Sequence, residues 1–186
     1  MHVPAAPPPA VFAFFTDPAR YVQWMGSEAD LEPVPGGVYR VRMADGFSAA
    51  GRFVEVAYPH LVVFTWGFAD DEAASRTKRE GGEPDGAGAM PAGSTRVTVT
   101  LRGEGGGTRL VLRHENLPSE SLRAGHDIAW NTYLPRLAVR AAGGDPGADP
   151  HARRRRGGPG DLRYLRAVTS VSDRDTPVLG VSDTHT

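Results

Sequence analysis

The chain has 186 residues, with 21 basic against 22 acidic side chains and a formal net charge of -1. This length is typical of one domain, and the balanced charge gives no field that would hold the chain on nucleic acid or on an anionic membrane. The absence of cysteine excludes disulfides, thiolate metal sites and a cysteine nucleophile. We find neither a signal peptide nor the roughly 20 apolar residues of a membrane helix, so we expect a soluble, cytoplasmic protein without membrane insertion.

Two short helices are predicted first. Prolines at 7–9 can occupy the first turn of a helix, and apolar residues follow them as far as Thr16. Asp17 followed by proline is typical of a helix cap and a first helical position. The second helix should therefore carry Tyr21 and Trp24.

Five segments then alternate apolar and polar residues with the period of two that is typical of strands. They cover residues 38–43, 47–56, 61–68, 96–102 and 108–114. Short turns join several of them, which indicates an antiparallel meander. In the last segment His114 continues the apolar face of Leu110 and Leu112, so a titratable side chain should point toward the core.

A long helix is predicted after these strands. Ser119 can cap it, and apolar residues then recur at spacings of three and four up to Gly143. His126 lies on the same stripe, where it would face His114 if the helix packs on the sheet. The order of elements predicts an α+β fold, in which a curved antiparallel sheet wraps around a C-terminal helix of about 22 residues.

Two stretches lack such patterning. Residues 69–93 contain no Val, Ile, Leu, Phe, Trp or Tyr, so we expect a mobile loop there. From 143 to 160 half of the residues are Gly or Pro, which indicates the end of the folded unit. We therefore predict one domain over residues 1–144, containing the mobile insertion 69–93, and a disordered tail rich in Arg, Gly and Pro over 145–186.

No pattern in the sequence indicates an enzyme of a known motif class. The chain has no Gly-x-Ser-x-Gly elbow and no His-Glu-x-x-His, and its six histidines lack the spacing of metal ligands. The glycines at 105–107 lead into a strand and lack the Lys-Ser/Thr ending of a nucleotide loop. We predict no metal site and no cofactor.

Several segments together resemble a known family. They are 8–24 (PPAVFAFFTDPARYVQW), 36–37, 51–56 and 61–66, followed by 94–97, 107–110, 114–118 and 130–137. In this order they are similar to the START-like, or SRPBCC, helix-grip superfamily, in particular to the branch named for the activator of the heat-shock-protein-90 ATPase. The resemblance covers roughly residues 8–150. The family normally begins with a full strand, which only residues 1–3 could represent here, so we expect most of that strand to be missing.

The resemblance implies a cavity between the sheet and the long helix, and an apolar cavity with a few polar groups is the usual form of a ligand site. Nine residues are predicted to line it, most of them aromatic: Phe14, Trp24, Tyr39, Phe53, Phe64, Trp66, His114, Trp130 and Tyr133. A plain core role is the more common one for aromatic residues on buried faces, so we expect several of the nine to serve packing alone. His114 is the only candidate for proton transfer, and a buried core histidine is the simpler interpretation.

Our preferred hypothesis is a non-catalytic domain that binds a small hydrophobic molecule. Trp66, Trp130 and Tyr133 would form walls of the cavity and His114 would supply a polar contact. One alternative is a co-chaperone-like module that binds a protein partner through its surface. The other is an enzyme of the polyketide cyclase or dehydratase type, with His114 as the acid or base. None of the three requires nucleic acid.

Overall fold

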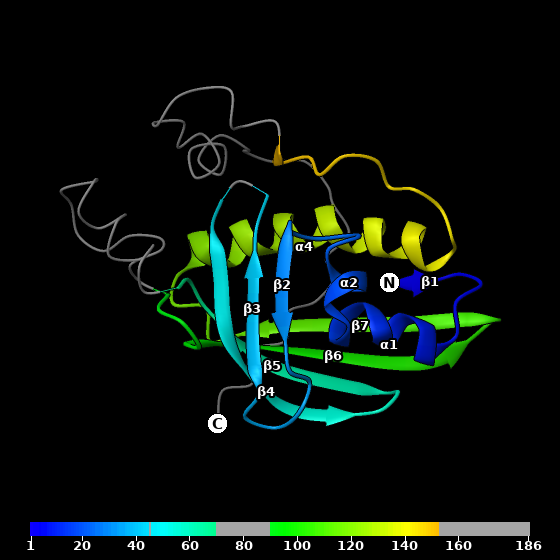
Figure 1. Ribbon diagram of the computed structural model, residues 1–186, viewed down its shortest axis with the longest axis horizontal. Coiled ribbons are helices and arrows are strands. Elements are labelled where there is room, and N and C mark those ends of the chain that lie inside the picture. The colour runs from blue at the N-terminus through cyan, green and yellow to red at the C-terminus, as the bar shows by residue number, and fades with distance from the viewer. Residues whose placement is uncertain (45, 70–89, 153–186) are drawn as a thin grey trace.

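The computed structural model describes residues 1–44, 46–69 and 90–152, and Figure 1 shows the arrangement of their helices and strands. The strands are β1 (His2–Val3), β2 (Glu28–Leu31), β3 (Val38–Arg42), β4 (Ser48–Ala57), β5 (Leu61–Trp66), β6 (Thr95–Glu104) and β7 (Gly107–Glu115). The helices are α1 (Pro8–Thr16), α2 (Pro18–Tyr21) and α4 (Glu120–Ala141). Within this part of the chain no helix combines the length and the apolar composition needed to cross a lipid bilayer.

The strands form one antiparallel sheet in the order β1-β7-β6-β5-β4-β3-β2, which confirms the predicted fold class. The β6–β7 ladder shows how one face becomes apolar. In this ladder Val97 lies opposite His114, and Leu101 lies opposite Leu110. Because side chains of directly paired residues project from the same face, His114 lies on the apolar inner face, as the alternation predicted.

The first short helix, α1, lies where the sequence predicted, and α2 begins at Pro18 as predicted but ends at Tyr21, so the prediction that it carries Trp24 was wrong. α1 starts at Pro8 and packs against β6 and α4. It buries four side chains: Val11, Phe12, Phe14 and Phe15. The Asp17 carboxylate then caps α2 by accepting a hydrogen bond of 2.8 Å from the backbone N–H of Ala19.

The long helix α4 lies over the inner face of the sheet and forms the second wall of the core (Figure 1). The Ser119 hydroxyl caps it by accepting a hydrogen bond of 3.2 Å from the N–H of Leu122. After the helix ends, Gly143 adopts a φ of +83°, a conformation that glycine takes at helix ends without steric cost. The buried side of α4 matches the predicted stripe and carries Leu122, Gly125, Trp130, Tyr133 and Leu137.

One strand, β2, was missed by the sequence analysis. Its four residues, Glu-Ala-Asp-Leu, offer only one large apolar side chain, Leu31, which is buried. The strand forms through its pairing with β3, in which Glu28 lies opposite Arg42 and Asp30 lies opposite Arg40. Opposite charges on paired residues favour such a ladder, and a pattern based on apolar alternation does not detect it.

Both ends of the unpatterned stretch 69–93 are part of the fold. β5 ends at Trp66, two residues earlier than predicted, and the N–H of Phe68 donates a hydrogen bond of 2.8 Å to the carbonyl of Met90. Ala69 and Met90 are buried. The predicted mobility concerns residues 70–89, which lie outside the described residues, as do residues 153–186 of the predicted tail.

β1 occupies the edge of the sheet beside β7. His2 pairs with Arg109 and Val3 pairs with Thr108. Val3 is fully buried, and the Thr108 hydroxyl donates a hydrogen bond of 2.6 Å to the carbonyl of Ala6. The two-residue strand is therefore tied to the sheet by its backbone and by the chain that follows it.

Candidate functional site

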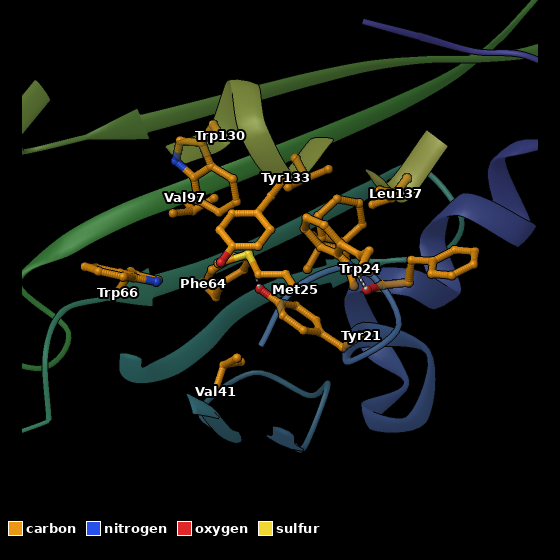
Figure 2. Packing of buried hydrophobic residues seen from close by; sticks show 14 of the residues in the cluster. Tyr21, Trp24, Met25, Val41, Phe64, Trp66, Val97, Trp130, Tyr133 and Leu137 are labelled. Carbon is orange, nitrogen blue, oxygen red and sulfur yellow. Dashed lines mark hydrogen bonds between the residues drawn. The ribbon is translucent and has the colours of Figure 1, made fainter. Parts of the chain in front are cut away.

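The candidate site is the aromatic core between the inner face of the sheet and α4. Figure 2 shows Phe64 and Trp66 projecting from β5, and Trp130 and Tyr133 projecting toward them from α4. All nine predicted residues are buried: Phe14, Trp24, Tyr39, Phe53, Phe64, Trp66, His114, Trp130 and Tyr133. Most of them belong to the buried core between the sheet and the helix. Seven of them divide between two clusters with different polar contacts, Phe14 lies beside the first cluster, and Tyr133 bonds to the segment after α4.

The first group is the tyrosine cluster, which consists of Tyr21, Trp24, Tyr39, Phe53 and Phe64, with Phe14 beside it. Tyr39 stacks on Phe64 with ring centroids 4.2 Å apart and an interplanar angle of 16°. The hydroxyls of Tyr21 and Tyr39 are 2.7 Å apart, and the indole N–H of Trp24 donates a hydrogen bond of 3.0 Å to the carbonyl of Phe14. These hydroxyl and indole groups therefore find their partners within the protein.

Burial fixes the protonation of this cluster. It raises the pKa of the Tyr21 and Tyr39 hydroxyls, because the phenolate would have to form away from water. The charge of each phenolate would also repel the other, which raises the pKa of Tyr39 further. Both tyrosines therefore stay neutral and share the hydrogen bond between their hydroxyls.

The second group is the histidine cluster, which consists of Trp66, His114, His126 and Trp130. The ring centroids of His114 and His126 are 4.8 Å apart, at an interplanar angle of 89°. Those of Trp66 and His126 are 4.9 Å apart. β5, β7 and α4 each contribute to this cluster, and the contact expected between His114 and His126 is confirmed.

The hydrogen bonds of His114 fix its tautomer. The Thr95 hydroxyl donates its proton to the carbonyl of Trp66 at 2.8 Å, so it accepts from Nε2–H of His114, also at 2.8 Å. On the other side of the ring, Nδ1 accepts a hydrogen bond of 3.2 Å from the indole N–H of Trp130. Both ring nitrogens of neutral His114 are therefore occupied by protein groups.

Both histidines of the cluster are held neutral. Burial lowers the pKa of His114 to about 3, and a charge on His126 would lower it further. Burial also lowers the pKa of His126, against the opposing effect of the hydrogen bond of 2.9 Å that its Nδ1–H donates to the Leu122 carbonyl. In the described parts of the chain no third His, Asp or Glu joins them to form a metal site.

Trp66 differs from the other two tryptophans of the chain. Its side chain is only 5% exposed, yet its indole nitrogen has no hydrogen-bond partner. The indole nitrogens of Trp24 and Trp130 both have one. Figure 2 shows the Trp66 nitrogen pointing into the core, in the direction of Phe64. The sequence identified Trp66 as buried, but no sequence signal shows that its N–H lacks an acceptor.

A segment after α4, residues 145–152, packs back onto the helix, and we call it the clasp segment. The hydroxyl of Tyr133 lies 3.2 Å from the Asp149 carboxylate and 3.0 Å from Nδ1 of His151. The guanidinium of Arg136 donates to the carbonyl of Trp24 at 3.1 Å and also to three clasp carbonyls, those of Pro146, Gly147 and Ala148. The predicted boundary at 144 therefore precedes residues that are hydrogen-bonded to α4.

The open hollows of the surface border other residues. One, of about 370 Å³, lies over β3, β4 and β5, where Arg40, Arg52 and Thr65 line it. These side chains project from the outer face, because they alternate with the inward residues Val41 and Phe64. Of the nine predicted site residues only Tyr39 borders this hollow.

The comparisons with known proteins agree with this architecture. The family described as Activator of Hsp90 ATPase homolog 1-like protein matches residues 5–142. The chain belongs to this family. An AHSA1-like protein from Rhizobium etli, solved in solution, is 42% identical, with a TM-score of 0.57 over 81% of this chain and 83% of that one. The clasp segment follows the part of the chain that the family matches.

Two more distant structures share the fold. DynU16, from the dynemicin biosynthetic locus, is 24% identical, with a TM-score of 0.60 over 78% of this chain and 46% of that one. An Hsp90 activator from Plasmodium falciparum is 24% identical, with a TM-score of 0.53 over 74% of this chain and 90% of that one. No curated protein matches the chain. At this identity the two structures show a common fold only, and they carry no information on the activity of this chain.

Proposed function

We propose that this protein binds a small, largely apolar ligand between the inner face of the sheet and α4, at the histidine cluster, and that it does so without catalysing a reaction. The observation that carries the proposal is the buried indole N–H of Trp66, which has no acceptor. Leaving a buried donor unsatisfied costs about 1–3 kcal/mol, and native proteins rarely do so. A ligand at this cluster would supply the missing acceptor.

The exposure of the two clusters supports the same location. Trp66, His114 and Trp130 retain 5–8% of their accessible surface, whereas Tyr39 and Phe64 retain none. Of these five residues, the three of the histidine cluster lie closer to solvent, so a ligand would reach them before it reached Tyr39 and Phe64. In this proposal the binding site is walled by Trp66, Trp130 and Tyr133, as the sequence analysis suggested. The polar contact comes from the indole N–H of Trp66, because both ring nitrogens of His114 are already hydrogen-bonded.

The hydrogen bonds of His114 argue against the enzyme alternative. A general base needs a free lone pair near its substrate. The lone pair on Nδ1 of His114 already accepts from Trp130, and its Nε2–H is bonded to Thr95. Protonation would bring a second N–H against the indole of Trp130, which agrees with a pKa of about 3. Glu115 is exposed and projects from the outer face, so it does not assist.

The co-chaperone alternative would use the exposed surface instead of the core. It is favoured by the description of the family and by the fold shared with the Plasmodium falciparum Hsp90 activator. The fold shared with DynU16, from a biosynthetic locus, favours a small-molecule ligand in the same general way. The unpartnered N–H of Trp66 favours the ligand, because binding of a protein at the surface would leave it buried and unsatisfied.

Native mass spectrometry of the purified full chain tests the proposal, followed by thermal unfolding with a panel of aromatic and aliphatic small molecules. We expect an adduct that is lost on denaturation, or a melting temperature that rises with ligand concentration. His126→Glu places a charge within the histidine cluster and should abolish the shift. Ile128→Glu is the matched control, because Ile128 is 49% exposed on the same helix.

Two results would contradict the proposal. One is the absence of any adduct and any shift across the panel, which would make the aromatic core purely structural and favour a protein partner, to be identified by pull-down. The other is an equal shift in the two glutamate variants, whether retained or lost, which would show that the ligand does not bind specifically at the histidine cluster.

A further inference from the structure

The indole N–H of Trp66, which has no partner, also limits the chemistry of the ligand. Two buried side-chain polar atoms lack a partner in the described parts of the chain, and the other one, Nε of Arg140, belongs to a guanidinium that bonds elsewhere through its remaining nitrogens. The side chain of Trp66 has one polar atom only, the indole nitrogen, and this atom can only donate. The missing partner must therefore be an acceptor.

The surroundings of Trp66 determine which acceptor fits. Its ring lies edge-to-face against Phe68 at 5.2 Å, His126 at 4.9 Å and His114 at 5.6 Å. Flat rings on several sides favour a flat, aromatic molecule. The cluster holds no cation that could pair with an anion, since both histidines are neutral. A carboxylate would enter as a buried, unpaired charge, which is costly.

The neighbouring histidine adds a second feature. Because Nδ1–H of His126 donates to the carbonyl of Leu122, the neutral ring carries its lone pair on Nε2. The ring of Trp66 thus packs against an imidazole that can accept a hydrogen bond. A hydroxyl group suits such a pair, since it can accept a hydrogen bond and donate one.

We propose that the ligand is a neutral, flat aromatic molecule with a hydroxyl group whose oxygen accepts a hydrogen bond from the indole N–H of Trp66. This inference rests on the proposed function, because it assumes that a ligand occupies the histidine cluster. It makes Trp66 the residue that distinguishes an oxygen-bearing ligand from a hydrocarbon of the same shape.

Three probes of similar size separate the possibilities: 2-naphthol, 2-methylnaphthalene and 2-naphthoate. Moving the hydroxyl of naphthol from water into the protein costs free energy. Naphthol should therefore bind no more tightly than the hydrocarbon unless the protein supplies a hydrogen-bond partner for this hydroxyl. We expect naphthol to bind about three- to tenfold more tightly than methylnaphthalene, the range that one hydrogen bond provides. Naphthoate should bind more weakly than naphthol.

Nitrogen-15 NMR of the full chain reports on the donor itself. The chain has three tryptophans and hence three indole N–H signals, which the variants Trp24→Phe, Trp66→Phe and Trp130→Phe assign. The Trp66 proton should move downfield when naphthol binds and should move less with methylnaphthalene. The protons of Trp24 and Trp130, which are already hydrogen-bonded, should move least. In Trp66→Phe the preference for naphthol should disappear, whereas Trp24→Phe should retain it.

The outcomes distinguish this inference from the proposed function. Equal binding of naphthol and methylnaphthalene to the wild type, with no selective shift of Trp66, overturns the inference and leaves the proposed function standing. Tightest binding of naphthoate also overturns it, because the site would then hold an anion. Binding of none of the three overturns the inference, and it overturns the proposed function as well only if the wider panel also gives no adduct and no shift. If Trp66→Phe does not fold, the wild-type affinities and the Trp66 signal decide the question.

Discussion

The tyrosine cluster and the histidine cluster share one core but differ in how their polar atoms are satisfied. In the tyrosine cluster the hydroxyls of Tyr21 and Tyr39 bond to each other, and the indole of Trp24 bonds to a backbone carbonyl. In the histidine cluster Trp130 and His114 are paired, but the indole N–H of Trp66 has no partner. Two sets of aromatic residues that look alike in sequence thus differ in the one property that a ligand could exploit.

This difference separates stability from function. A cluster whose polar groups are all paired gains nothing from a ligand, so its substitutions should act on folding alone. A cluster with an unpaired donor is less stable than its packing would allow, and a ligand can recover that free energy. The following predictions test this separation, beginning with the largest expected effect.

Phe64→Ala should cause the largest loss of stability. Phe64 is fully buried and stacks on Tyr39, so its removal leaves a cavity in the middle of the tyrosine cluster. The free energy of unfolding should fall by about 3–5 kcal/mol, measured by urea denaturation. A loss below about 1 kcal/mol would mean that the cluster collapses around the gap and is not a close-packed core.

His114→Phe should be the next most destabilising substitution. It removes the acceptor of the Trp130 indole and the donor to the Thr95 hydroxyl, so two buried groups lose a partner at once. We expect a loss of about 2–4 kcal/mol in urea denaturation. His114→Gln is the matched control, because its amide can both accept and donate, and it should recover most of the loss. Equal losses in the two variants would contradict the hydrogen-bond assignment.

A pair of identical substitutions compares the clusters directly. Trp24→Phe and Trp66→Phe remove similar ring area, but only the first breaks a hydrogen bond, that to the carbonyl of Phe14. Without ligand, Trp24→Phe should therefore cost about 1–2 kcal/mol more than Trp66→Phe, measured by thermal and urea unfolding. If Trp66→Phe is the more damaging of the two, its N–H is satisfied in solution, and the difference between the clusters disappears.

The pH dependence of stability reports on the protonation of His114 itself. The pKa of His114 is about 3 in the folded protein and 6.5 ordinarily, so the unfolded chain takes up a proton first as the pH falls. The stability from neutral His114 is complete above pH 6.5 and is lost progressively toward pH 3, by up to about 1.4 kcal/mol per pH unit. Urea denaturation at pH 7, 6 and 5 should show a steeper decline for the wild type than for His114→Gln. Parallel declines would show that His114 is not held neutral.

The sequence predicted the fold better than the site, for physical reasons. Periodicity reports which side of a strand or helix is buried, and it located His114 on the inner face and His126 on the inner stripe of α4. Periodicity does not report register or distance. It therefore could not distinguish Tyr39, whose hydroxyl bonds to that of another tyrosine, from Trp66, whose indole N–H has no hydrogen-bond partner. The resemblance to a family suggested a cavity, but it carried no information on which polar atoms the rings leave unpaired.

Two structural parts escaped the sequence for a different reason. β2 and the clasp segment are poor in large apolar residues. Backbone pairing and hydrogen bonds hold them in place, rather than the burial of an apolar face. Charged residues of β2 lie opposite arginines of β3, and three clasp carbonyls accept from Arg136. Such elements depend on a partner distant in the sequence, so a local pattern gives no sign of them.

The clasp segment also decides where the rest of the chain is tethered. α4 ends at Ala141, but the chain returns along it, and His151 lies 3.0 Å from the Tyr133 hydroxyl, near the middle of the helix. Tyr133 is three residues, about one helical turn, from Trp130 of the histidine cluster. Whatever follows Ala152 therefore starts beside the proposed binding site rather than at the far end of the helix. A fluorophore or a fused domain attached there would begin within a short reach of any ligand that enters, and a fragment cut at residue 142 would lose this attachment point altogether.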